Sequence, residues 1–217
     1  MVEQDKFSLS NISIGLLWLF HVSGIIGIVY GNSEWFVSAT PLNLSLCFIL
    51  IFLNTPINKK LFFIFLACFF LGMIAEILGV NYQLIFGSYH YGEILGPKIM
   101  GVPLLLGINW FILTMITAAI AQEFSSKLWQ QTLIGITLMV FLDLLIEPIA
   151  PLLDFWEFEG GEAPFQNFIG WALVSLPLQV FFQRLKIRFN NSFPYHLYLL
   201  QVLFFTILLL KSNTLGI

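Results

Sequence analysis

Seven long apolar runs constrain this chain more than any other feature of its sequence. The hydrocarbon core of a bilayer is about 30 Å thick, and a helix needs roughly 20 apolar residues to cross it. Backbone polar groups in lipid must bond to one another, so such runs predict helices. We expect an all-α, polytopic membrane helix bundle of about seven transmembrane helices. The runs cover residues 12–30, 41–53, 61–78, 102–121, 132–147, 165–182 and 195–210.

The composition supports a membrane protein, because only 10% of residues are charged and 59% are hydrophobic. The second run is short and could begin near Trp35, and the first lacks the basic start and cleavage site of a signal peptide. With no soluble segment left over, residues 1–217 are expected to form a single integral membrane domain. A net charge of −3 argues against nucleic acid as a partner. Cys47 and Cys68 both lie inside apolar runs, which suggests neither a disulfide nor a metal site.

Basic residues are distributed unevenly between the two sides of these seven spans. Lys98 and Lys211 fall on one side. The opposite side carries Lys6, Lys59, Lys60, Lys127, Arg184, Lys186 and Arg188. Since short loops rich in Lys and Arg stay in the cytoplasm, the N-terminus is predicted to be cytoplasmic, with the protein in the cell (inner) membrane.

Three carboxylates lie near the outer ends of apolar runs, where they are candidate catalytic residues. Glu76 ends the third run, and Asp143 and Glu147 end the fifth, four residues apart and so on one helix face. Pro148 follows directly, which predicts a helix end near Glu147. Two acids in one low-dielectric place do not both ionise easily, and a retained proton is what a general acid needs. The alternatives are half-solvated helix ends and a structural ion pair of Glu76 with Lys98.

The tract GSYHYGEILGPKIMGVP, residues 87–103, separates the third and fourth spans with glycines and prolines. Non-helical backbone at membrane depth is tolerated where protein buries it or where it lines a cavity. Gly87, Gly92, Gly96 and Gly101 would allow tight turns there. We therefore expect a re-entrant or capping loop over the outer end of the bundle that admits water. An ordinary outer loop is the alternative.

Several ordered motifs between about residues 75 and 171 point to one known family. They are Glu76 and Gly79; Phe86, Gly87, Tyr89, Tyr91, Gly96 and Pro97; residues 101–103 and Trp110; Asp143, Glu147 and Pro148; Trp156; and Asn167, Phe168, Gly170 and Trp171. In these positions the chain resembles the integral-membrane carotenoid biosynthesis family that includes carotenoid 1',2'-hydratases and bisanhydrobacterioruberin hydratase.

The resemblance implies acid-catalysed addition of water to the terminal C1=C2 double bond of an acyclic carotenoid end group, without a redox cofactor or metal. The expected partners are a long acyclic or monocyclic carotenoid, water, membrane lipids and other carotenoid enzymes. We expect Glu76, Asp143 and Glu147 to be catalytic, with an aromatic wall that stabilises a carbocation. Glu93 and Lys98 could orient water or each other. The expected substrate-binding residues are Tyr89, Tyr91, Glu93, Lys98, Trp110, Trp156, Asn167 and Trp171.

Other functions remain compatible with the sequence. A membrane lycopene cyclase shares the first protonation but traps the cation with an internal alkene. A retinal-binding photoreceptor needs a lysine deep inside a helix, whereas Lys211 lies at the very end of the last run. A small-molecule transporter or lipid-binding protein would explain intramembrane acids, although the sequence shows no obvious repeated halves.

Overall fold

The computed structural model describes residues 8–189 and 191–215, and within them seven helical spans are long and apolar enough to cross a membrane. The expected all-α polytopic bundle is confirmed. Lys6, which was counted for the orientation, lies outside the described residues. The spans are α1 (Leu9–Tyr30), α2 with α3 (Ser33–Ser38 and Thr40–Asn54), α4 (Lys59–Tyr82), α5 (Leu104–Phe124), α6 (Leu128–Ile146), α7 (Phe165–Leu185) and α8 (Phe193–Leu215).

Local chemistry explains where several of these helices begin and end. The Asn58 side chain accepts hydrogen bonds from the backbone N–H groups of Lys60 and Leu61, so α4 begins before its apolar run. Helix α6 ends at Ile146, as the following Pro148 predicted. The second span begins near Trp35 and is interrupted at Ala39. Pro41 in the first turn of α3 lacks the N–H group that would bond back into α2.

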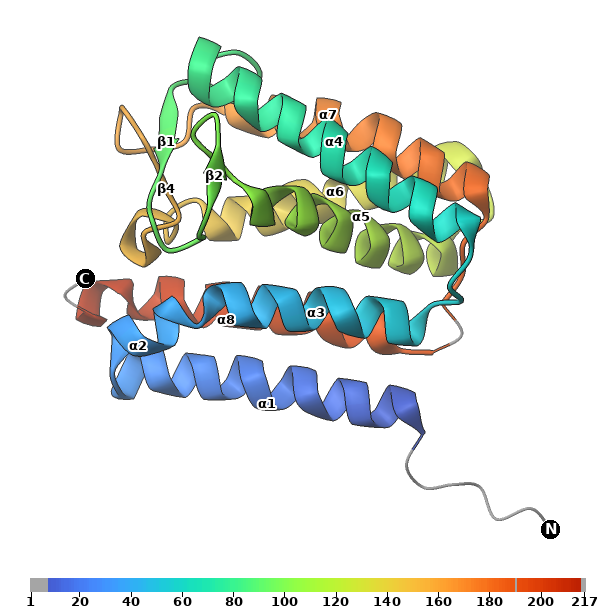
Figure 1. The fold of residues 1–217 in the computed structure, drawn as a ribbon, viewed down its shortest axis with the longest axis horizontal. Helices are drawn as coiled ribbons and strands as arrows, with labels where there is room; N and C mark the ends of the chain where they lie inside the picture. The colour runs from blue at the N-terminus through green and yellow to red at the C-terminus, as the bar shows by residue number, and fades with distance from the viewer. Residues whose placement is uncertain (1–7, 190, 216–217) are drawn as a thin grey trace.

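Helix α5 forms the centre of the bundle, because it packs against α3, α4, α6, α7 and α8. Every residue of α5 from Trp110 to Ala121 is buried, as expected for a helix that is apolar on all sides. In Figure 1, helices α4 to α7 form one group, and α1, α2, α3 and α8 lie beside it. Phe111 joins the two groups, since its ring centroid lies 5.7 Å from Phe48 of α3 and 5.4 Å from Phe65 of α4.

Short strands close one end of the bundle (Figure 1). Strand β1 (Tyr89–Tyr91) pairs antiparallel with β4 (Trp156–Phe158), which follows the 3-10 helix η1 (Pro151–Leu153). Strands β2 (Lys98–Ile99) and β3 (Val102–Pro103) form a second antiparallel pair. The tract 87–103 is therefore a capping loop, fastened to the loop between α6 and α7. The sequence analysis had predicted no strand in either loop.

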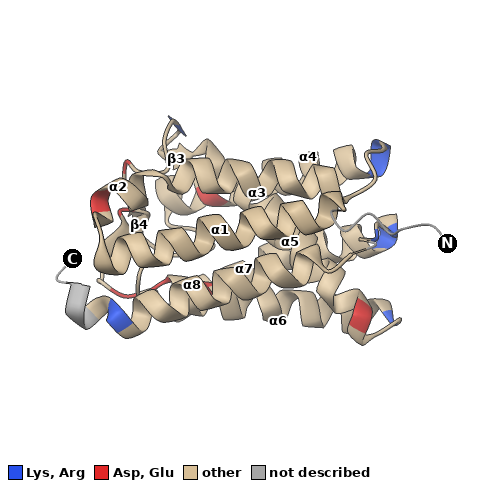
Figure 2. Cartoon of the chain, turned by 90° about the horizontal axis from the view of Figure 1, so that it is seen from below, with Lys and Arg blue, Asp and Glu red and all other residues tan. Residues whose placement is uncertain are grey.

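The charged residues divide between the two ends of the bundle, as Figure 2 shows. Most Lys and Arg residues of the described chain lie at the end opposite to the strands, within the connections α3–α4, α5–α6 and α7–α8 or in the helical turns next to them. Lys98 and Lys211 lie towards the strand end, together with most of the acidic residues. The end with the strands is thus the one predicted to face away from the cytoplasm.

Candidate active site

Glu76 of α4 is buried beneath the capping loop and accepts three hydrogen bonds. The hydroxyl groups of Tyr89 and Tyr91 donate to its Oε2 atom at 2.5 and 2.7 Å. The indole N–H of Trp110 donates to Oε1 at 2.9 Å. Three donors directed at one carboxyl group favour its ionised form, since each bond is stronger to a charged acceptor. The three donors would stabilise a negative charge on Glu76.

Two glycines on the same face of α4 make room for these donors. Gly72 and Gly79 lie four residues before and three residues after Glu76. A Cβ atom at Gly72 would lie 2.5 Å from the Trp110 ring, and one at Gly79 would lie 2.6 Å from the Tyr89 hydroxyl. Side chains of a strand alternate, so Tyr89 and Tyr91 of β1 both point inward while the intervening His90 is exposed.

The two tyrosines keep their protons at neutral pH. Burial, followed by the nearby negative charge of Glu76, raises the pKa of Tyr89 and of Tyr91 above the ordinary range. A neutral phenol is a donor, and both hydroxyls donate to Glu76. The capping loop thus provides two fixed donors to a carboxylate of the bundle.

Asp143 and Glu147 form a second carboxyl site at the end of α6. The Asn167 side-chain amide donates to Asp143 Oδ2 at 2.9 Å and to Glu147 Oε1 at 2.8 Å. The Trp156 indole N–H donates to Glu147 Oε2 at 3.0 Å. In the described part of the chain Asp143 Oδ1 has no hydrogen-bond partner, and the shared Asn167 amide brings the two carboxyl groups together.

The surroundings of this pair favour a shared proton. Burial raises the pKa of Glu147, although the hydrogen bonds from Trp156, Asp143 and Asn167 oppose the shift. Two neighbouring buried carboxyl groups that both lost their protons would repel each other in a low dielectric. The pair is therefore suited to hold one proton, whereas Glu76 is surrounded by three hydrogen-bond donors.

A small cavity of about 20 Å³ lies between the two carboxyl sites, and Glu76 and Glu147 both line it. This volume holds roughly one water molecule. Aromatic side chains form much of the remaining wall, and Trp171, which stacks on Trp110 with ring centroids 4.5 Å apart, is one of them. The other lining residues are Phe86, Tyr89, Tyr91, Leu106, Asn109, Trp156, Phe158 and Asn167.

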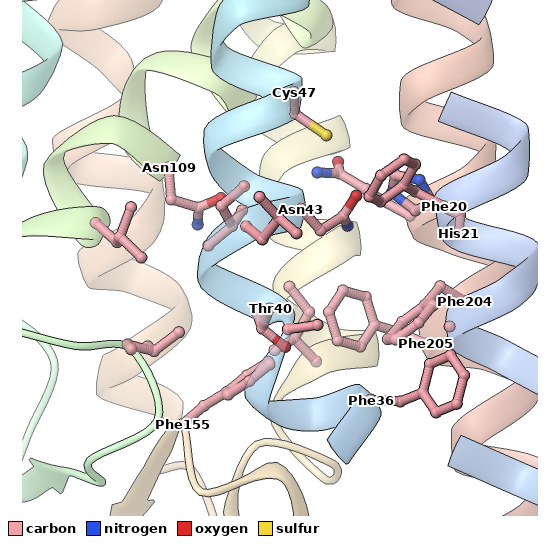
Figure 3. A pocket seen from close by; sticks show the side chains of 18 of the residues that line it. Phe20, His21, Phe36, Thr40, Asn43, Cys47, Asn109, Phe155, Phe204 and Phe205 are labelled. Carbon is pink, nitrogen blue, oxygen red and sulfur yellow. The ribbon is translucent and has the colours of Figure 1, made fainter. Parts of the chain in front are cut away.

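A larger cavity of about 410 Å³ adjoins the small one, within the usual range for small-molecule sites (Figure 3). It lies between α1, α2, α3, α5, α6 and α8, and its wall is mostly apolar and aromatic. Leu19, Trp35 and Leu42 of this wall are largely exposed on the outside of the bundle, so the cavity opens towards lipid. Three residues line both cavities and therefore lie between the apolar space and the carboxyl groups: Leu106, Asn109 and Trp156.

Four predicted site residues line neither cavity: Asp143 and Trp110, which hydrogen-bond to the lining residues Asn167 and Glu76, and also Glu93 and Lys98. Lys98 Nζ and Glu93 Oε1 form an ion pair of 2.8 Å at the surface, where the Glu93 side chain is 90% exposed. Lys98 also donates to the backbone carbonyl of Tyr91. The alternative ion pair of Lys98 with Glu76 is absent from the described structure, because each group has other partners.

The structure also brings in residues that the sequence analysis did not select. Asp154 accepts hydrogen bonds from the backbone N–H groups of Glu93 and Ile94 and thereby fastens the capping loop. Gly92 leaves the space for it, since a Cβ atom there would lie 2.1 Å from the Asp154 carboxylate. Asn109, a polar residue inside an apolar span, could have been found by the reasoning that selected Glu76.

Polar side chains also line the larger cavity, among them His21, Asn43 and Gln201 (Figure 3 labels the first two). His21 bonds through Nδ1 to the Leu17 carbonyl of its own helix. Within the described residues, Asn43 Oδ1 and Gln201 Oε1 are buried without a partner. The sequence analysis had not selected these residues for the site.

Comparison with known proteins identifies the family. The sequence matches the carotenoid biosynthesis protein family over residues 37–216. The chain belongs to this carotenoid biosynthesis family. It is 27% identical over 106 residues to a bisanhydrobacterioruberin hydratase of Haloarcula japonica, an alignment that covers 45% of this chain and 36% of that protein. The chain thus matches little more than a third of the relative's length. No solved structure matches this member of the carotenoid biosynthesis family.

Proposed function

We propose that this protein hydrates the terminal C1=C2 double bond of an acyclic carotenoid end group. The observation that carries the proposal is the junction of the two cavities. An apolar space that opens to lipid ends beside a water-sized polar cavity lined by Glu76 and Glu147. An alkene end group in the first space would meet an acid, a base and one water in the second. Membership of the carotenoid biosynthesis family and the hydratase relative support the same reaction.

The reaction would begin at the Asp143–Glu147 pair. Its shared proton forms a C–H bond at C2, the less substituted alkene carbon, and the π bond breaks to leave a tertiary cation at C1. Proton donation by a positioned acid contributes typically 10²- to 10⁴-fold to a rate. Asn167 holds both carboxyl groups in place and is a positioning residue for this step.

Glu76 would complete the addition. Its negative charge stabilises the neighbouring cation, and the aromatic faces of Trp171 and Trp156 add to this stabilisation. The water oxygen bonds to C1, and the proton that it releases passes to a carboxylate. Return of that proton to the Asp143–Glu147 pair through water resets the site. Every atom of the product alcohol comes from the alkene and water, so these steps use no cofactor.

The substrate and partners follow from the larger cavity. Its size suits an end group with part of a polyene, and its opening towards lipid lets the remainder of a long acyclic or monocyclic carotenoid lie in the bilayer. Membrane lipids would surround the bundle, and other carotenoid enzymes would supply the substrate or take up the product.

Expression in a host that accumulates acyclic carotenes tests this function. We expect more polar pigments that are heavier by one water per modified end, with nearly unchanged visible absorption, because the terminal alkene lies outside the conjugated polyene. Products of unchanged mass and blue-shifted spectrum would identify a cyclase instead. Uptake of a solute into vesicles, without any new pigment, would identify a transporter.

A further inference from the structure

Asn109 of α5 occupies the boundary between the two cavities. Leu106 and Trp156 share this position, but Leu106 is apolar and the Trp156 indole N–H donates to Glu147. The Asn109 amide has no hydrogen-bond partner among the residues that the structure describes. Of the three shared side chains, Asn109 is thus the one with uncommitted polar atoms.

The other polar groups around the small cavity serve its carboxyl groups. The hydroxyls of Tyr89 and Tyr91 donate to Glu76, and the Asn167 amide donates to Asp143 and Glu147. The Trp171 indole N–H is also uncommitted within the described chain, but Trp171 does not line the larger cavity. On the wall that faces the apolar space, Asn109 is therefore the side chain whose polar atoms are available to bind water.

The attacking water needs such a group. A buried water makes about three hydrogen bonds, and the small cavity offers it the carboxylates of Glu76 and Glu147. These two acceptors alone would leave the position of the water relative to the apolar cavity undetermined. A third partner on the shared wall fixes the water oxygen next to the end group.

We propose that Asn109 positions the attacking water at this boundary, and so determines that the carbocation is captured by water instead of losing a proton. The inference rests on the proposed hydratase function. Capture forms a C–O bond at C1. Without a positioned water, the cation loses a proton from a neighbouring carbon, and an alkene forms again. A variant without the Asn109 amide should therefore still protonate the alkene but hydrate it much less.

The test follows both steps in membranes incubated with an acyclic carotene in deuterated water. The wild-type product should carry deuterium at the carbon next to the new alcohol. Asn109→Leu, which keeps the size but removes the amide, should lower hydration roughly ten- to hundredfold, the cost of one buried hydrogen bond. The recovered carotene should nevertheless gain deuterium, because protonation persists. Asn109→Thr should restore part of the hydration, and Asn11→Leu, the same change on the exposed surface of α1, should match wild type.

Several outcomes would overturn the inference. Hydration by Asn109→Leu within about twofold of wild type would show that the amide holds no essential water. Loss of both hydration and deuterium uptake by folded Asn109→Leu would place Asn109 in protonation or binding instead. If Asn109→Leu fails to accumulate, hydration and deuterium uptake are measured on Asn109→Thr, and the same two outcomes would overturn the inference. A wild-type protein that forms no hydrated product would overturn the proposed function itself.

Discussion

The carboxyl groups of the candidate site differ in what surrounds them, although their sequence settings are alike. Glu76 accepts hydrogen bonds from three donors. Asp143 and Glu147 instead accept from the same Asn167 amide and are neighbours of each other. Donors stabilise an anion, and a neighbouring acid favours a retained proton. This difference supports the opposite roles that we propose for residues that hydropathy alone cannot distinguish.

Substitution of the carboxyl groups tests these roles. Asp143→Asn should lower hydration about 10²- to 10⁴-fold, because the amide keeps the shape but carries no acidic proton. Glu76→Gln should also abolish most turnover, since it removes the negative charge that faces the cation. Both variants should remain folded in the membrane. The measurement is hydrated carotenoid formed per amount of inserted protein.

Glu123→Gln is the matched control for these variants, because Glu123 is exposed at the opposite end of the bundle and lines neither cavity. It should hydrate at the wild-type rate. Full activity in both Asp143→Asn and Glu76→Gln would show that the reaction takes place elsewhere.

The pH dependence of the rate follows from the raised pKa of Glu147. Burial makes its carboxyl group keep a proton above the usual range near 4.3, so the proton is lost as pH rises through the raised pKa. In the proposed reaction the protonated pair is the active form, so the rate should fall on the alkaline side and be retained at lower pH. Initial rates in membranes buffered at different pH give this profile. A rate that increases with pH through neutrality would contradict a protonated acid.

At the scale of elements, the sequence predicted the spans but not how their ends meet. Apolar length identified the helices, and Pro148 placed the end of α6, because both are local properties. The pairing of β1 with β4 joins residues 89–91 to 156–158, and three-residue strands are too short to show a period. The hydrogen-bond partners of Glu76 depend on which helix faces pack together. The glycines of α4 permit this packing, but they do not specify which residues will contact Glu76.

The close approach of the capping loop to α4 can be tested at Gly79. Gly79→Ala places a methyl group in steric conflict with the Tyr89 hydroxyl, since the Cβ atom would be 2.6 Å from it. Tyr89 must then move and lose its bond to Glu76, and hydration should fall about tenfold. Gly15→Ala on α1, whose Cβ atom would meet nothing within 4 Å, is the matched control and should retain activity. Equal rates for the two variants would argue against a role for the Tyr89–Glu76 bond.

At the scale of the whole molecule, the candidate catalytic carboxyl groups and most of the positive charges lie at opposite ends of the bundle. The carboxyl sites lie under the strands, whereas most of the described Lys and Arg residues lie at the other end, within the connections α3–α4, α5–α6 and α7–α8 or in the helical turns next to them. We propose that residues 1–217 act as a single domain in the inner membrane, with the N-terminus in the cytoplasm. The substrate would then enter from lipid while water reaches the site from the outer end.

Reporter fusions test this orientation directly. A reporter fused after Lys127, in the basic connection between α5 and α6, should read cytoplasmic. One inserted near Glu159, which follows β4, should read the opposite side, because α6 crosses the membrane between them. The predicted orientation depends on the distribution of Lys and Arg. Adding several lysines next to Glu159 should therefore reduce the fraction of molecules with that orientation. Adding glutamates at the same place should change this fraction little. Both reporters on the same face would exclude α6 as a span, and exchanged faces would place the candidate active site on the cytoplasmic side.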